Sequence, residues 1–168
     1  MCLRIALILL CAGAVLAEPT EFPVKGYVLN LDVMLPVAPE KAFDLTTGDI
    51  SGWWDHHMSE HPKQLYIEPR PGGGFFEIFD DSGNGVRHAV VTCAERGKRL
   101  RFEGPLGMAG RAFTMVTTWD YEAAGDSTRL TCTVNMNGQI DADTAKLVEG
   151  VWRHFLIEQL QPWAAKNR

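Results

Sequence analysis

Apolar and polar residues alternate along much of the chain, and this period of two predicts a series of β-strands. In the segment 113–122, for example, Phe113, Met115 and Trp119 fall on one face of an extended chain. Turn-forming residues separate such segments, as in the Asp-Ser-Gly-Asn-Gly sequence at 81–85. The predicted strands cover residues 24–37, 64–68, 74–79, 86–94, 99–103, 113–122 and 129–137.

The period changes near the C-terminus. From residue 141 to about residue 163, apolar residues recur every three or four positions, which predicts one long amphipathic helix. Asp141 is a suitable N-cap for this helix, and Pro162 is expected to end or bend its last turn.

Two short helices are expected after the first strand. One covers residues 40–45 behind a proline, and the other, a helix or a loop, carries Ile50, Trp53 and Trp54. A strongly bent antiparallel sheet with the long helix across its concave face would cover every apolar stripe. The pattern therefore predicts an α+β fold.

The first residues are expected to be a signal peptide. Arg4 precedes an apolar run at 5–15. Residues 15 and 17 are small, as a signal peptidase requires at the two positions that it reads before the cleavage site. The apolar run is shorter than the roughly 20 residues that span a bilayer. We therefore expect cleavage after residue 17, a single domain at 18–168, no membrane span in the mature chain, and a periplasmic or secreted location.

Charge and cysteine content narrow the possible partners. The formal net charge is −5 and basic residues are not clustered, which argues against nucleic acid and anionic membrane surfaces as partners. Beyond the leader the cysteines are Cys93 and Cys132, each within a strand-like apolar run. We expect buried thiols there, although an exported protein could oxidise them to a disulfide. The sequence leaves the oligomeric state open.

Six short signatures occur in order along almost the whole predicted domain. They are a strand, proline and short helix at 33–43, a tryptophan-bearing segment at 50–54, a proline-glycine hairpin at 68–75, and strand or loop signatures at 86–91, 98–107 and 128–131. Their order and spacing resemble the START-like superfamily, also called SRPBCC. The resemblance is closer to its branch of polyketide cyclases and homologues of the activator of heat-shock ATPase.

The resemblance implies a helix-grip fold, in which a curved antiparallel sheet of about seven strands wraps around a long C-terminal helix. It also implies a cavity between sheet and helix, but it fixes no activity, because relatives range from lipid carriers to cyclases and co-chaperones. Our leading hypothesis is an exported domain that binds a small hydrophobic or amphipathic molecule. The residues predicted to contact it are Trp53, Trp54, Phe75, His88, Phe102, Met115, Trp119, Val134, Trp152 and Phe155.

Histidines near the tryptophans raise the question of a metal. His57 and His61 are four residues apart, which suits two metal ligands on one face of a helix. Pro62 follows at once, however, and no further Cys or His spacing supports a zinc site. We interpret this segment as an exposed polar turn and predict no metal and no cofactor.

Two other classes of function stay open. A cyclase or hydrolase could use His88 and an inward carboxylate as acid and base. We favour a structural role for His88 in the sheet wall, and a solvated convex face for Glu68, Glu77, Glu103 and Asp120. The sequence contains no recognisable catalytic motif, so no catalytic residue is assigned. The third class is a protein-interaction module.

Overall fold

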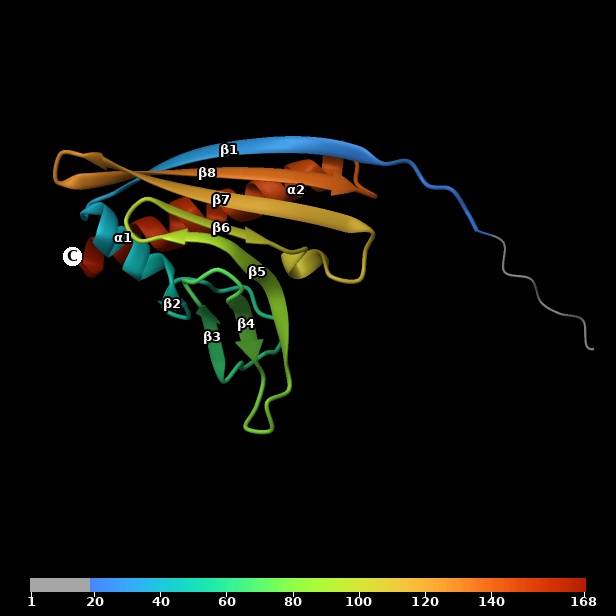
Figure 1. Cartoon of the computed structure of the whole chain (residues 1–168), viewed down its shortest axis with the longest axis horizontal. Coiled ribbons are helices and arrows are strands. Elements are labelled where there is room, and N and C mark those ends of the chain that lie inside the picture. The colour runs from blue at the N-terminus through green and yellow to red at the C-terminus, as the bar shows by residue number, and fades with distance from the viewer. Residues whose placement is uncertain (1–18) are drawn as a thin grey trace, which may run out of the picture.

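The computed structural model describes residues 19–168, so the expected signal peptide at 1–17 lies outside the described residues. Eight antiparallel strands form one sheet in the order β1-β8-β7-β6-β5-β4-β3-β2 (Figure 1). The strands are β1 (Lys25–Leu35), β2 (Gly48–Asp49), β3 (Gln64–Ile67), β4 (Gly74–Ile78), β5 (Gly85–Glu95), β6 (Arg99–Glu103), β7 (Phe113–Ala124) and β8 (Ser127–Gly138). All seven predicted strands are present, and the eighth, β2, has two residues.

The sheet is strongly curved. The strands β3, β4 and β5 bend away from the long strands β1, β7 and β8 (Figure 1). Two irregularities in register occur at this bend, between Phe75 and Phe76 in the β4–β5 pair and between Val91 and Cys93 in the β5–β6 pair. Since an extra residue on one strand bends it and increases its twist, these bulges contribute to the curvature.

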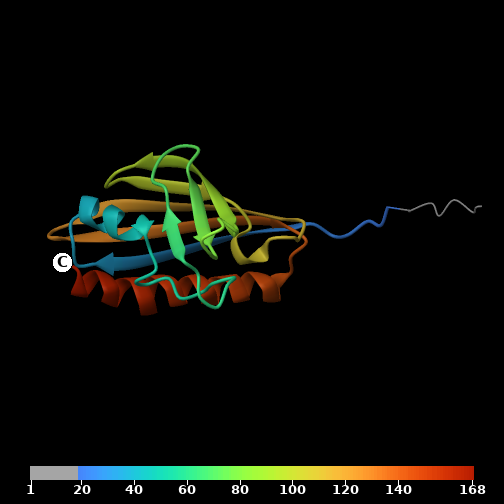
Figure 2. The same ribbon diagram turned by 90° about the horizontal axis from the view of Figure 1, so that it is seen from below.

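The C-terminal helix is continuous over 25 residues. It consists of α2 (Ala142–Arg153), a π-helical segment η2 (His154–Leu160) and α3 (Gln161–Lys166), and it lies along the sheet beside β1 (Figure 2). The Asp141 side chain caps α2 by accepting a hydrogen bond from the Thr144 N–H at 2.8 Å, as predicted. The helix continues past Pro162, which lies in the first turn of the last helical segment and does not end it.

The short helices match the prediction in part. The helix α1 (Pro39–Thr46) has a proline in its first turn, as expected. Residues 50–54 form a single turn, in which the Trp53 and Trp54 N–H groups both donate to the Ile50 carbonyl, at 3.1 and 2.9 Å. The second short helix is therefore only a turn, and a short 3-10 helix not predicted from the sequence, η1 (Leu106–Met108), follows β6.

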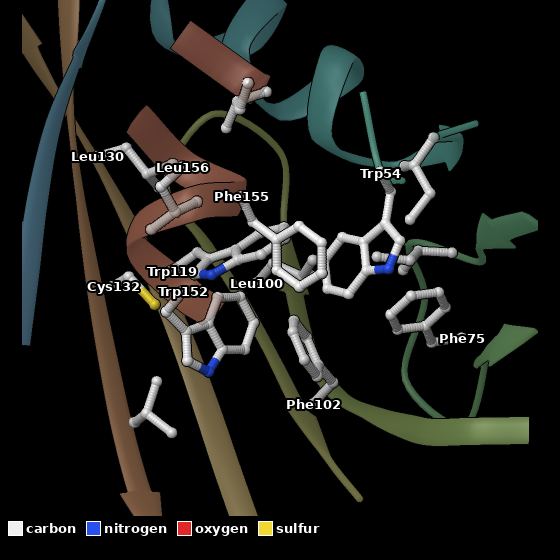
Figure 3. Packing of buried hydrophobic residues seen from close by; sticks show 14 of the residues in the cluster. Trp54, Phe75, Leu100, Phe102, Trp119, Leu130, Cys132, Trp152, Phe155 and Leu156 are labelled. Carbon is white, nitrogen blue, oxygen red and sulfur yellow. The ribbon is translucent and has the colours of Figure 1, made fainter. Parts of the chain in front are cut away.

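Aromatic side chains fill the space between the helix and the sheet. Trp152 of the helix packs edge-to-face on Trp119 of β7, with ring centroids 6.1 Å apart. Phe102 of β6 also packs edge-to-face on Trp119, at 5.3 Å (Figure 3). These three side chains are almost completely buried, so they make the centre of the core.

The two cysteines beyond the leader are free thiols. Cys93 lies on β5 and Cys132 on β8, with β6 and β7 between them. Three inter-strand spacings of about 4.8 Å place their Cα atoms about 14 Å apart, beyond the reach of a disulfide. Burial raises the pKa of the Cys132 thiol to about 12.

Within residues 19–168, no helix combines the length and the apolar character needed to cross a membrane.

Candidate functional site

A pocket of about 290 Å³ opens between the C-terminal helix and the bent end of the sheet. Its volume is at the lower end of the range of small-molecule sites, roughly 300–1,000 Å³. Apart from three histidines, every lining residue is apolar. The wall is formed by Trp54, His56, His57, Met58, Phe75, His88, Pro105, Leu106, Gly107, Met108, Met115, Leu147, Val148, Val151, Trp152 and Phe155.

The adjacent tryptophans have different environments. The Trp54 ring stacks on Phe155 with centroids 3.8 Å apart and meets Phe75 edge-to-face at 5.0 Å (Figure 3). Trp53 instead donates its indole N–H to the Leu45 carbonyl at 3.1 Å and packs within the core. The turn at 50–54 thus directs Trp54 into the pocket wall and Trp53 away from it.

The structure divides the predicted contact residues into two groups. Trp54, Phe75, His88, Met115, Trp152 and Phe155 line the pocket. Trp53, Phe102, Trp119 and Val134 do not, because they lie in the closed core with side chains that are almost completely buried. Sequence periodicity identifies the inward face of a strand but does not show where packing beneath the helix stops. Contact of the first group with a ligand stays a prediction.

The mouth of the pocket contains residues that the sequence did not single out. Met58 is 58% exposed and Leu147 is 64% exposed, so two large apolar side chains face solvent at the rim.

The loop after β6 forms another wall of the pocket, and Leu106 in this loop has a positive φ of 49°. A bulky residue rarely adopts this conformation, which marks the loop as locally strained.

This loop lies close to β5 because of Gly104. A Cβ atom at residue 104 would lie 2.3 Å from the His88 carbonyl oxygen and 2.5 Å from the Ala89 Cα. Only glycine allows that approach without a shift of the backbone. The Gly-Pro-Leu-Gly sequence at 104–107 is the feature of the sequence from which this wall of the pocket could have been predicted.

A β-bulge turns His88 toward the interior. Phe75 pairs with Ala89 while Phe76 pairs with Arg87, so His88 is the extra residue on β5. As a result, both His88 and Ala89 are buried, where simple alternation would bury only one of them. Bulges are known to redirect side chains in this way. His88 is 8% exposed and lines the pocket.

His88 forms a pair with Glu77, whose carboxylate is completely buried. The distance between His88 Nε2 and Glu77 Oε2 is 3.0 Å. The same carboxylate accepts the Met58 N–H at 2.9 Å and the Ser59 N–H at 2.7 Å. Our assignment of Glu77 to a solvated convex face is therefore wrong. Glu77 lies two residues after Phe75 and so shares its inward face.

Electrostatics keep Glu77 ionised. Burial alone would raise the pKa of its carboxyl group, but the hydrogen bonds from Met58, Ser59 and His88 outweigh this effect and lower the pKa below its ordinary value. Residues 55–63 form a loop over the pocket, called the covering loop below. The carboxylate holds residues 58–59 of this loop in place and orients the His88 ring. The other carboxylates named with it behave as expected: Glu68 pairs with Arg70, and Asp120 pairs with Arg99, near the surface.

His57 and His61 lie in an exposed, non-helical loop, as our interpretation of an exposed turn expected. Their neighbour His56 lies 2.8 Å from Asp55 through its Nδ1 atom. His154, from the C-terminal helix, reaches Asp55 from the other side at 2.8 Å. Hydrogen bonds to Glu158 and Asp55 raise the pKa of His154, although partial burial opposes this.

Comparison with known proteins supports the architecture. Neither a protein-family model nor a curated protein sequence matches the chain. Among solved structures, the Mll3558 protein from Rhizobium loti has 24% identity and a TM-score of 0.61, covering 80% of this chain and 95% of its own. The AHSA1-like protein from Rhizobium etli has 22% identity and a TM-score of 0.57, covering 84% and 83%. Ara h 8.0201 has 12% identity and a TM-score of 0.60, covering 84% and 99%.

The chain adopts the helix-grip fold. The AHSA1-like and Ara h 8-like neighbours belong to the SRPBCC superfamily, so the fold expected from the sequence signatures is confirmed. At these identities the likeness establishes the fold alone, and both the superfamily of this chain and its branch stay predictions. In this helix-grip protein, the pocket lies at one end of the interface between the sheet and the helix.

Proposed function

We propose that the protein binds a small amphipathic molecule in the pocket beneath the helix. The observation that carries this proposal is an apolar pocket with one deeply buried polar side chain, His88, in its wall. Small-molecule sites commonly combine an apolar wall with a few placed polar groups that fix orientation. The helix-grip fold is also typically a ligand binder.

The chemistry of His88 indicates the polar group of the ligand. Because Glu77 is an ionised acceptor, it holds the His88 proton on Nε2. With its proton on Nε2, the ring presents Nδ1 as an acceptor, and within residues 19–168 the ring's only hydrogen bond is the one to Glu77. A ligand with an apolar body and one hydroxyl or N–H group would complete the site.

We further propose that the protein acts after export, in a periplasm or outside the cell, on the basis of the leader pattern at residues 1–17. Expression with the leader, followed by mass measurement of the protein from the external fraction, tests this. The expected product begins at residue 18. Recovery of the uncleaved chain from the cytoplasm would contradict export and would leave the binding proposal standing.

The binding proposal is tested by native mass spectrometry of the purified protein and by displacement of an environment-sensitive fluorescent probe. Val151→Trp places a large side chain in the pocket wall and is expected to weaken binding at least tenfold. Val28→Trp adds the same side chain on the outer face of β1 and is the matched control. Equal affinity in both variants, with no co-purifying molecule, would refute the pocket as a binding site.

A second candidate is proton-transfer catalysis, favoured by the distance of 3.0 Å between His88 and Glu77. A histidine oriented by a buried carboxylate is a common general base. Within residues 19–168, no serine, threonine or cysteine lines the pocket, so these residues offer no hydroxyl or thiol in its wall for a covalent intermediate. The reaction would use water or an acidic proton of the ligand.

His88→Gln separates the two candidates. If the protein only binds its ligand, the wild type and the His88→Gln variant should carry the same bound molecule, with lower occupancy in the variant. An enzyme would yield product from the wild type and unreacted substrate from the variant. Identification of the bound molecule by mass spectrometry therefore decides between them.

A further inference from the structure

Three potential metal ligands meet beside the mouth of the pocket. Asp55 and His56 come from the covering loop, and His154 comes from the π-helical segment η2. One ligand atom from each lies within 4.8 Å of those of the other two. Asp55 lies between the two rings, with Oδ1 2.8 Å from His56 Nδ1 and Oδ2 2.8 Å from His154 Nε2.

A second carboxylate orients His154. Glu158 Oε2 lies 2.9 Å from His154 Nδ1, on the side of the ring opposite to Asp55. Metal-binding histidines usually donate their other N–H to a carboxylate or carbonyl, which fixes the tautomer and makes the free nitrogen a better ligand. Glu158 therefore prepares Nε2 of His154 to bind a cation.

The π-helical segment makes this arrangement possible. In an α-helix, residues five apart point in different directions. Here Gln159, five residues after His154, reaches both His154 Nε2 at 3.4 Å and Asp55 at 3.1 Å. Single π-turns often occur at functional sites, and this one gathers three polar side chains toward the covering loop.

We propose that Asp55, His56 and His154 bind a divalent transition-metal cation, and that Zn²⁺ fits best. Oδ2 of Asp55 and Nε2 of His154 lie 2.8 Å apart, close enough for one cation to contact both atoms. Two imidazoles and a carboxylate suit Zn²⁺ better than Mg²⁺ or Ca²⁺, which prefer oxygen ligands alone.

Such a site would link the covering loop to the C-terminal helix. Three protein ligands also leave the fourth position of a tetrahedral zinc ion for water or another small ligand. The site differs from the pair of His57 and His61, which the sequence offered as a possible metal site and which lies outside this cluster. This proposal does not depend on the pocket having a ligand.

The test is direct titration of the chelator-treated full domain with Zn²⁺ alone, with Co²⁺ as a spectroscopic probe. We expect about one equivalent of Zn²⁺ per chain and visible Co²⁺ bands of a four-coordinate N/O site. His154→Ala and His56→Ala are expected to weaken binding at least 100-fold. Glu158→Gln, which removes only the orienting group, is expected to weaken it about 10–100-fold.

The double variant His57→Ala/His61→Ala is the matched control, because it removes two exposed histidines near the cluster and leaves the proposed ligands intact. Circular dichroism checks that every variant is folded. Absence of stoichiometric Zn²⁺ binding by the wild type would overturn the proposal. So would loss of binding in the control variant with retention in His154→Ala, because adventitious surface histidines would then be the ligands.

Discussion

Replacing the buried Glu77 carboxylate tests how the pocket is held together. The carboxylate is 0% exposed and accepts hydrogen bonds from three donors: the Met58 N–H, the Ser59 N–H and the His88 ring. Glu77→Gln keeps the shape but removes the charge, and its amide nitrogen cannot accept. Hydrogen bonds to a charged group exceed neutral ones by about 1 kcal/mol each, so three of them predict a loss of about 3 kcal/mol in unfolding free energy.

The effect should depend on pH. The pKa of Glu77 in the folded protein is below its ordinary value, so the folded state binds this proton less readily than the unfolded state. Its stabilising contribution is therefore complete above the unfolded glutamate pKa of about 4.3 and is lost as the pH falls through the folded pKa. The difference between wild type and Glu77→Gln should be largest at neutral pH and should shrink below about pH 4.

Urea denaturation at several pH values, followed by tryptophan fluorescence, measures this difference. Glu103→Gln, at an exposed position on β6, is the matched control and should change stability by less than about 0.5 kcal/mol. A Glu77→Gln effect that stays constant from pH 7 to pH 3 would refute the assignment of a buried carboxylate. A loss no larger than that of the control would do the same.

Two further predictions concern the loop walls and the thiols. Gly104→Ala should lower the unfolding free energy by about 1–3 kcal/mol in thermal or urea unfolding, because its Cβ would meet the backbone of β5. Gly107→Ala, with open space around its Cβ, should leave the unfolding free energy nearly unchanged. An equal loss of stability in the two variants would contradict the close approach of residue 104 to β5. Cys93 should react with a thiol reagent well before Cys132, whose burial raises its pKa to about 12. Mass spectrometry of the partly modified protein measures the order, and faster labelling of Cys132 would refute the burial.

The sequence predicted the fold well because the fold follows from periodicity. Strands β7 and β8 pair continuously over their 12 residues, so one alternating pattern describes each of them completely. The apolar stripe predicted the C-terminal helix equally well. The sequence did not predict that the helix continues past Pro162, because the π-helical segment before the proline changes the hydrogen-bond pattern without an obvious mark in the sequence.

The candidate site was predicted less well, and the reasons differ from residue to residue. Glu77 could have been placed inward, since it is two residues from Phe75 on the same strand. His88 could not be placed by alternation, because a bulge shifts the register at that position. The cluster of Asp55, His56 and His154 joins residues about 100 positions apart in the chain, and no local spacing predicts such a contact.

Two anchors hold the loop that covers the pocket, and they lie on either side of its exposed part. Glu77 binds the backbone at Met58 and Ser59, while the contacts of Asp55 with His154 fix the loop to the helix. The segment 56–58, which runs from one anchor to the other, contributes side chains to the pocket wall. If a ligand passes this segment, loosening either anchor should speed both binding and release, since both steps use the same opening. Affinity would then change less than either rate, which distinguishes a role in access from a role in ligand contact.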